Sequence, residues 1–211
     1  MTNADKKLGY DSGDKTTVAR IKTFASQNGA LIGLIILCIA LSIVAPAFLS
    51  ASNLMNVGIQ AATVAILAFG QTFVIVAAGI DLSVGATAAV ASMLVAYTGA
   101  NMGLPAGVTI IVGLLAGAVF GALSGMMNAF LRLPSFIATL AMMSVARGLT
   151  LVISDGRPIS TSGMVNFFGG TIIGIPVTII MMVIMGIIAS VILNFTTIGR
   201  SMYAVGGYME A

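Results

Sequence analysis

A single ionisable residue, Asp81, interrupts the otherwise uncharged stretch between Lys22 and Arg132. Long apolar runs flank it, and the whole chain is 59% hydrophobic and only 7% charged. Soluble domains carry roughly 25% charged residues. No soluble fold can bury this much apolar surface, so the sequence predicts an all-α, polytopic membrane protein. A carboxylate at the centre of a membrane helix costs about 2.5–3.5 kcal/mol, which makes Asp81 a candidate functional residue.

Apolar segments of about the length that crosses a bilayer predict a bundle of about six transmembrane helices. They cover residues 29–47, 57–79, 82–97, 106–130, 136–153 and 171–193. Residues 29–194 therefore form the membrane domain. Residues 1–28 are expected to be a flexible cytoplasmic tail, and residues 195–211 a cytoplasmic loop.

The positions of lysine and arginine set the expected orientation, because cytoplasmic segments are rich in both. With the N-terminus inside, the inside segments hold Lys6, Lys7, Lys15, Arg20, Lys22, Arg132 and Arg200. The outside segments then hold only Arg157, and Arg147 falls within the fifth span. We therefore expect both the N-terminus and the C-terminus to face the cytoplasm.

Several chemistries lack their usual residues in this sequence. The chain has no histidine, which removes the usual participant in zinc sites and acid–base catalysis. A nucleotide-binding P-loop needs Gly-Lys-Ser/Thr, and no lysine follows Lys22. We therefore expect no metal, no bound cofactor and no enzyme activity. If nucleotide drives this protein, another chain binds it. The basic residues form no stripe, so no nucleic-acid partner is expected.

Four glycines spaced four residues apart mark one face of the fourth span. They are Gly113, Gly117, Gly121 and Gly125. Residues i and i+4 stack along a helix, and small residues in that register let another backbone approach closely. The row predicts close helix packing, either within a tight core or at a contact with a second copy.

The surroundings of Asp81 allow three interpretations. Gly79 and Gly85 bracket a helix break, so Asp81 is suited to cap the third span by accepting a backbone N–H near Ser83. Alternatively Asp81 lines a solute pathway, or it pairs with Arg147. Pathway candidates are Gln71, Asp81, Ser83 and Arg147.

Three stretches, taken together and in order, resemble the membrane subunit of ribose-type sugar ABC importers. The first is Gly79-Ile80-Asp81-Leu82-Ser83-Val84-Gly85. The second runs from Asn128 to Leu140 and continues to Ala146-Arg147-Gly148-Leu149. The third is Gly199-Arg200-Ser201-Met202-Tyr203-Ala204-Val205-Gly206-Gly207. The resemblance covers residues from about 29 to the end.

The resemblance implies a permease in the bacterial plasma membrane that translocates a monosaccharide. Its partners would be cytoplasmic ATPase cassettes, which bind ATP and Mg²⁺, a second permease copy or paralogue, and an extracytoplasmic sugar-binding protein. The third stretch resembles the coupling loop that contacts the cassette. Candidate coupling residues are Gly199, Arg200, Tyr203, Gly206, Gly207 and Glu210.

The same resemblance leaves alternatives open. Relatives continue through this loop into further helices, so the chain is expected to be a truncated form, which leaves a non-functional fragment as one possibility. An ABC permease for branched-chain amino acids or another small solute is a rival within transport. A membrane-embedded enzyme or an ion-coupled transporter would need more intramembrane ionisable groups than Asp81.

Overall fold

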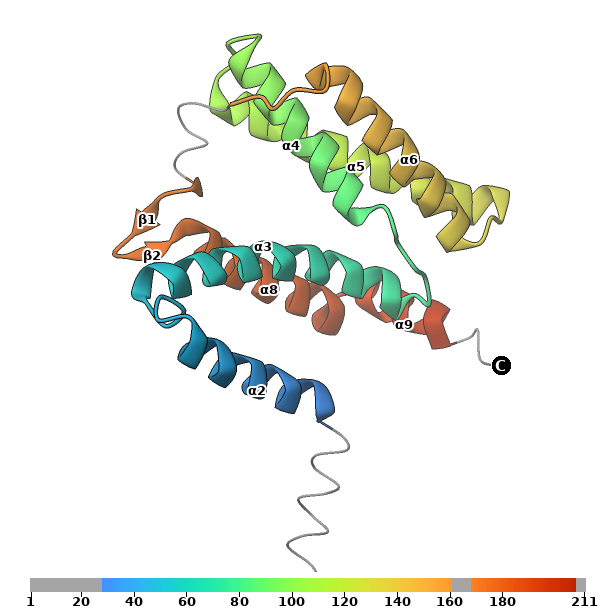
Figure 1. The fold of residues 1–211 in the computed structure, drawn as a ribbon. Helices are drawn as coiled ribbons and strands as arrows, with labels where there is room; N and C mark the ends of the chain where they lie inside the picture. The colour runs from blue at the N-terminus through green and yellow to red at the C-terminus, as the bar shows by residue number, and fades with distance from the viewer. Residues whose placement is uncertain (1–27, 161–167, 208–211) are drawn as a thin grey trace, which may run out of the picture. The chain divides into compact units, whose positions relative to one another are not determined.

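The computed structural model describes residues 28–160 and 168–207, with elements labelled as in Figure 1. The chain divides into two compact units, Met1–Leu54 and Met55–Ala211. In the first unit, helix α2 (Gly29–Val44) is apolar and buries none of its residues. It ends at Ala45, whose extended backbone is typical of a residue before proline, here Pro46.

Helix α3 (Ala51–Val76) begins in the first unit and continues into the second. It ends in a turn in which Gly79 N–H donates to Val74 O at 2.8 Å and Ala78 N–H to Ile75 O at 2.9 Å. Ala78 takes the left-handed conformation, with φ of 56°. These two bonds form a Schellman motif, which satisfies the last carbonyls of the helix and sets the start of the Asp81 loop.

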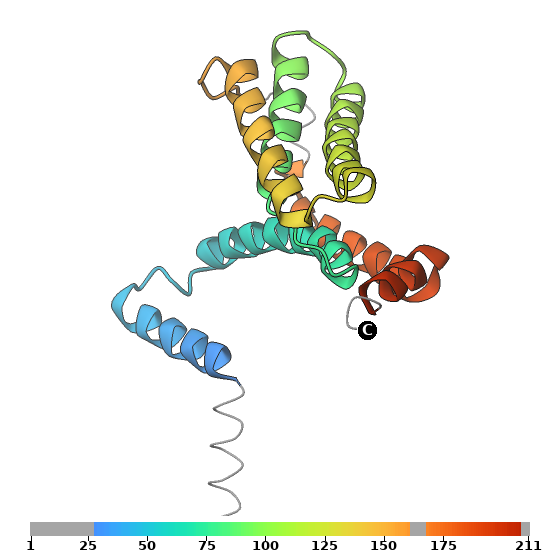
Figure 2. The same cartoon turned by 90° about the vertical axis from the view of Figure 1, so that its right-hand side faces the viewer.

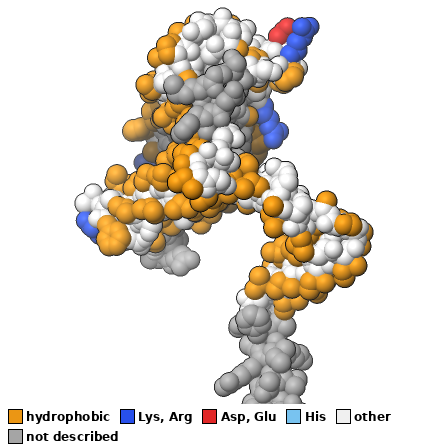
Figure 3. All heavy atoms as spheres, turned by 90° about the vertical axis from the view of Figure 1, so that its left-hand side faces the viewer, with side chains coloured by type: hydrophobic (Ala, Val, Ile, Leu, Met, Phe, Trp, Pro, Cys, Tyr) orange, Lys and Arg blue, Asp and Glu red, His pale blue; other side chains and the backbone are white. Residues whose placement is uncertain are grey.

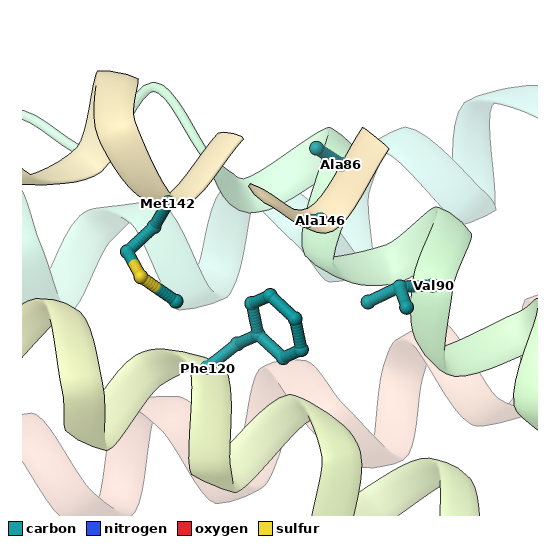
Figure 4. Close-up of a cluster of buried hydrophobic side chains, with 5 residues drawn as sticks. All are labelled: Ala86, Val90, Phe120, Met142 and Ala146. Atoms are coloured by element: carbon teal, nitrogen blue, oxygen red, sulfur yellow. The ribbon is translucent and has the colours of Figure 1, made fainter. Parts of the chain in front are cut away.

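The core of the second unit lies between α4 (Val84–Ala100), α5 (Ala106–Leu131) and α6 (Ser135–Ser154). Figure 4 shows the buried side chains at its centre, which are Ala86, Val90, Phe120, Met142 and Ala146. Pro105 and Pro134 directly precede α5 and α6, where the missing proline N–H removes no helical bond. The three helices thus form one packed cluster.

Helix α8 (Val177–Phe195) follows a short hairpin of strands β1 (Thr171–Ile172) and β2 (Ile175–Pro176). The expected sixth span, residues 171–193, therefore holds this hairpin followed by α8, and its limits in the membrane stay a prediction. Ile173 and Gly174 both have positive φ, at 53° and 78°. This reversal pairs the flanking residues as strands, so the helix begins only after the hairpin.

Helix α3 runs alongside α8, as the two views in Figures 1 and 2 show. A Cβ built on Gly186 of α8 would lie 3.2 Å from the ring of Phe69, and one on Gly58 would lie 3.1 Å from Ile179 Cδ1. Helix α9 (Thr197–Gly207) follows α8 after one residue. Small residues thus allow close contact between α3 and α8.

The all-helical prediction is confirmed: residues 28–160 and 168–207 form seven helices and one two-residue-per-strand hairpin. Within those ranges, four helices are long and apolar enough to cross a membrane, namely α3, α5, α6 and α8. Helices α2 and α4 are apolar but shorter, at 16 and 17 residues. Hydrophobic side chains cover much of the visible helical surface in Figure 3, as expected of helices that face lipid.

Candidate solute site around Asp81

Asp81 holds the start of α4 through its own side chain. Its Oδ1 accepts hydrogen bonds from Ser83 N–H at 2.7 Å and from the Ser83 hydroxyl at 2.6 Å. Ser83 is 3% exposed and directly precedes α4. Asp81 thus accepts the Ser83 N–H in an Asx turn from residue 81 to residue 83. Ser83 itself is the N-cap residue of α4, and its side chain makes no capping hydrogen bond. The carboxylate therefore shapes the turn that leads into the helix and does not bond to the N–H groups of its first turn.

The Asp81 loop is fastened to the first turns of α6. Ser135 Oγ accepts the Ile80 N–H at 3.0 Å, and Thr139 Oγ1 accepts the Leu82 N–H at 3.2 Å. The Thr139 hydroxyl in turn lies 3.3 Å from Ile80 O. Two hydroxyls one helical turn apart therefore position the backbone on both sides of Asp81.

Two clefts meet at Asp81, and Gly121 of α5 also borders both. The Gln71 cleft has a volume of about 370 Å³ and lies between α3, α4 and α5. Its lining includes Gln71, Asp81, Ser83, Thr87, Gly113 and Gly117. It thus brings together three of the four pathway candidates.

The Ser124 cleft has a volume of about 330 Å³ and lies on the other side of Asp81. Its lining includes Asp81, Ser124, Asn128, Ser135, Thr139 and Met202. These residues come from α5, α6, α9 and the Asp81 loop. Segments far apart in the sequence therefore meet at one site.

One buried polar atom in each cleft lacks a protein hydrogen-bond partner. They are Gln71 Oε1 and Ser124 Oγ, and no other such atom occurs in the described parts of the chain. Buried polar atoms are paired in the great majority of cases, because an unpaired one costs about 1–3 kcal/mol. Unpaired groups in a cleft are available to bind a solute.

The glycine row of α5 packs closely at only one position within this chain. A Cβ on Gly113 would lie 2.5 Å from Val95 Cγ2 and 3.4 Å from Ala91 O, whereas one on Gly117, Gly121 or Gly125 would meet nothing within 4 Å. Among the described residues, close packing on this row is therefore seen at Gly113. The other three glycines line the clefts, and no described residue lies within 4 Å of a Cβ built on them. A contact with a second copy stays a prediction.

Arg147 lies apart from the other pathway candidates, Gln71, Asp81 and Ser83. It is exposed on α6, it lines neither cleft, and no ion pair joins it to Asp81. Its neighbour Ala146 faces the helical core instead. Adjacent helical residues point about 100° apart, so Arg147 is turned away from the core that Ala146 faces.

Helix α9 separates the predicted coupling residues onto two faces. Gly199 is buried, and a Cβ there would overlap Leu193 O; a Cβ on Gly206 would overlap Val76 O. Arg200, Tyr203 and Gly207 are exposed. Glu210 lies outside the described residues. Gly199 and Gly206 therefore pack against the backbone of the same chain, whereas Arg200, Tyr203 and Gly207 are exposed.

Ser124, Ser135 and Thr139 were not singled out from the sequence. Ser135 and Thr139 lie in the second family-like stretch at a spacing of four, which places both on one face of a helix and could have indicated a shared role. Ser124 is one residue from Gly125 and seven from Gly117, so it extends the glycine face. A hydroxyl on the same helix face as the glycines could therefore have indicated Ser124 from the sequence.

The chemistry of the site is that of neutral hydrogen bonding. Asp81 is the one charged residue among the described residues that line the two clefts. Within the described ranges, no cluster of three His, Cys, Asp or Glu could hold a metal ion. Amide and hydroxyl groups beside apolar walls are suited to bind a small solute rather than to transform it.

Comparison with known proteins yields a family and several relatives. A family model described as the permease component of branched-chain amino acid transport systems matches residues 53–211. Ribose import permease protein RbsC of Bacillus subtilis (strain 168) is 45% identical over 187 residues, covering 87% of this chain and 58% of that protein. RbsC of Haemophilus influenzae is 40% identical over 200 residues, covering 92% and 62%.

A more distant relative is fructose import permease protein FrcC of Rhizobium meliloti. It is 32% identical over 216 residues, covering 96% of this chain and 60% of that protein. The chain thus spans about three fifths of the length of these relatives. No solved structure matches it.

The family match covers most of the chain, and it agrees with the apolar helices that the structure shows. The chain is a membrane protein and belongs to the family described as permease components of branched-chain amino acid transport systems.

Proposed function

We propose that this chain serves as the membrane permease component of an ATP-driven importer for a monosaccharide of the ribose type. Its similarity to permeases named for ribose and fructose import supports a sugar substrate. The residues that line the two clefts favour a neutral solute. Gln71, Thr87, Ser124 and Asn128 offer neutral hydrogen-bonding groups beside apolar walls.

The family description raises branched-chain amino acids as a second candidate. A free amino acid carries a carboxylate, which needs a cation or several N–H donors when it leaves water. Among the described residues that line the clefts, none is lysine or arginine. Asp81 could pair with the ammonium group of an amino acid, but the carboxylate of that amino acid would be left without a cationic partner. The site therefore favours a neutral, hydroxylated solute over an amino acid.

The topology that we propose has six spans, with both ends of the chain in the cytoplasm. Helices α2, α3, α4, α5, α6 and α8 supply the spans. Helix α4 would be about 26 Å long, which is shorter than the hydrocarbon core of about 30 Å. The Asp81 loop, which precedes α4, would cover the remaining distance near the cytoplasmic side while buried in protein.

The proposed partners follow from the absence of a nucleotide site in the sequence and from the exposed face of α9. Two cytoplasmic ATPase cassettes would bind ATP and Mg²⁺, and one would dock on α9 at Arg200 and Tyr203. A second permease copy or paralogue would complete the membrane gate. A sugar-binding protein would deliver the solute from outside. Residues 1–28 would form a cytoplasmic tail, and residues 195–211 the coupling segment.

Uptake by the assembled system tests this proposal. Cells that lack their own ribose and leucine transport would express this protein together with an ATPase and a sugar-binding protein of a ribose-type importer. We expect accumulation of labelled ribose that disappears when the P-loop lysine of the ATPase is replaced. Accumulation of leucine without any sugar would overturn the proposal in favour of the amino-acid candidate.

A further inference from the structure

Among the buried hydroxyls of the described residues, that of Ser124 is the exception, because it has no hydrogen-bond partner. Ser42, Ser144 and Thr150 each donate to the carbonyl four residues earlier in their own helix, at 2.7 to 3.1 Å. This bond is the usual way to satisfy a hydroxyl inside a helix. Ser124 is 9% exposed, yet its Oγ makes no hydrogen bond. Its polar group is therefore buried and available.

Most other polar groups in the Ser124 cleft are already engaged. Ser135 and Thr139 hold the loop backbone, and Asn128 Nδ2 donates to Leu133 O at 2.9 Å. Asp81 is different, because both of its bonds fall on Oδ1. Its Oδ2 accepts no hydrogen bond from the described residues. The cleft thus presents the buried, unpaired hydroxyl of Ser124 and a free carboxylate oxygen of Asp81.

The glycine face of α5 leaves space between these two groups. Gly121 and Gly125 line the cleft with Ser124, and a Cβ on either glycine would meet nothing within 4 Å. The volume of about 330 Å³ is near the lower end of the range of small-molecule sites, which begins at about 300 Å³. A cleft of this volume suits a solute the size of a monosaccharide better than a larger ligand.

We infer that the Ser124 cleft is a binding site for a small neutral polyol. One solute hydroxyl donates to Asp81 Oδ2, and another exchanges a hydrogen bond with Ser124 Oγ. A polyol suits both groups, since each of its hydroxyls can donate and accept. The inference rests on the proposed function. It adds Ser124 to the residues that would bind the solute in the pathway, next to Asp81, which the sequence already indicated as a candidate.

Protection of an introduced thiol by sugar tests the inference. In a Cys38→Ser background, Ser124→Cys would react with methyl methanethiosulfonate in membranes that contain the assembled importer. We expect ribose at ten times its dissociation constant to slow this reaction about tenfold, as simple occupancy requires. Ser92→Cys is the matched control, because Ser92 is exposed on α4, donates to Ala89 O and lies outside both clefts. Its reaction should not respond to ribose.

Uptake measured in the same membranes distinguishes a failure of the proposed transport function from a failure of the proposed binding site at Ser124. If the wild-type protein imports ribose but the sugar does not protect the thiol of the Ser124→Cys variant, or that thiol never reacts, the inference is wrong and the proposed function stands. If no sugar is imported at all, both are wrong.

A second variant covers the case in which Ser124→Cys fails to assemble. We expect Ser124→Ala to raise the KM for ribose about tenfold while kcat stays unchanged, because one hydrogen bond to the solute is lost. Ser92→Ala should change neither. An unchanged KM in Ser124→Ala would overturn the inference.

Discussion

Gly206 of α9 lies directly against the backbone carbonyl of Val76, the last residue of α3. A Cβ at position 206 would overlap that oxygen and would lie 3.4 Å from the backbone nitrogen of Ala78. Asp81 follows only a few residues later, and Met202 on the same face of α9 borders the Ser124 cleft. Helix α9, the candidate coupling segment, therefore touches the backbone that leads into the solute site.

Replacement of Gly206 by alanine should disturb this contact. The added methyl group has no space against the Val76 carbonyl, so α9 must shift. We expect a loss of about 1–3 kcal/mol, typical of overpacking, seen as a lower melting temperature of the purified protein in detergent. Gly207→Ala is the control, because a Cβ there meets nothing within 4 Å. Equal effects of the two variants would contradict the observed packing.

Two glycines of α5 should respond differently to the same substitution. Gly113→Ala places a methyl group against Val95 and should destabilise the α4–α5 contact by about 1–3 kcal/mol. Gly117→Ala has open space and should be neutral or stabilising by up to about 1 kcal/mol, because alanine favours the helix. Thermal unfolding of both variants decides this. A destabilised Gly117→Ala would instead indicate a close contact with a second copy.

Substitutions of Asp81 separate its structural role from its role toward solute. Asp81→Asn keeps an oxygen that can accept the Ser83 N–H and should fold like the wild type, whereas Asp81→Ala should lose about 0.5–2 kcal/mol. We also expect Asp81→Asn to raise the KM for ribose uptake, because the asparagine amide no longer presents a second acceptor oxygen. Normal uptake by this variant would show that Asp81 does not bind the solute and serves only to hold the turn before α4.

The exposed face of α9 should carry the contact with the ATPase. Arg200→Ala and Tyr203→Ala are expected to reduce copurification of the ATPase without lowering the melting temperature of the permease, because Tyr203 is 53% exposed and Arg200 has no ion-pair partner among the described residues. Arg157→Ala removes the same charge from an exposed turn on the opposite side of the proposed membrane and is the matched control. Reduced copurification in Arg157→Ala would contradict the proposed topology.

Hydropathy was enough to locate most helices along the chain. Each of the six apolar segments overlaps one helix of the structure, and the expected break between Gly79 and Gly85 separates α3 from α4. The hairpin at residues 171–176 was missed because Ile172, Ile173 and Ile175 are as apolar as a span. Hydropathy averages composition and does not detect a turn with two consecutive positive φ values.

The candidate site depended more on tertiary structure. The sequence alone pointed to Asp81, Gln71 and Ser83, because polar groups within apolar segments are costly and are seldom without a role. The sequence could not show that Arg147 lies outside both clefts. Hydropathy marks a polar residue within an apolar segment, but it does not tell in which direction the side chain points. Ser124 received no attention because hydroxyls are common in helices, where they normally bond to their own backbone.

Local composition and motif were sufficient to establish the membrane class, the family resemblance and the approximate course of the helices. Three further findings required the folded chain: Ser124 and Gln71 flank Asp81 in neighbouring clefts, Arg147 points elsewhere, and Gly206 meets Val76. Helices in lipid lack a hydrophobic drive to associate, so their rotation and pairing are set by close packing and hydrogen bonds between residues that are distant in the sequence.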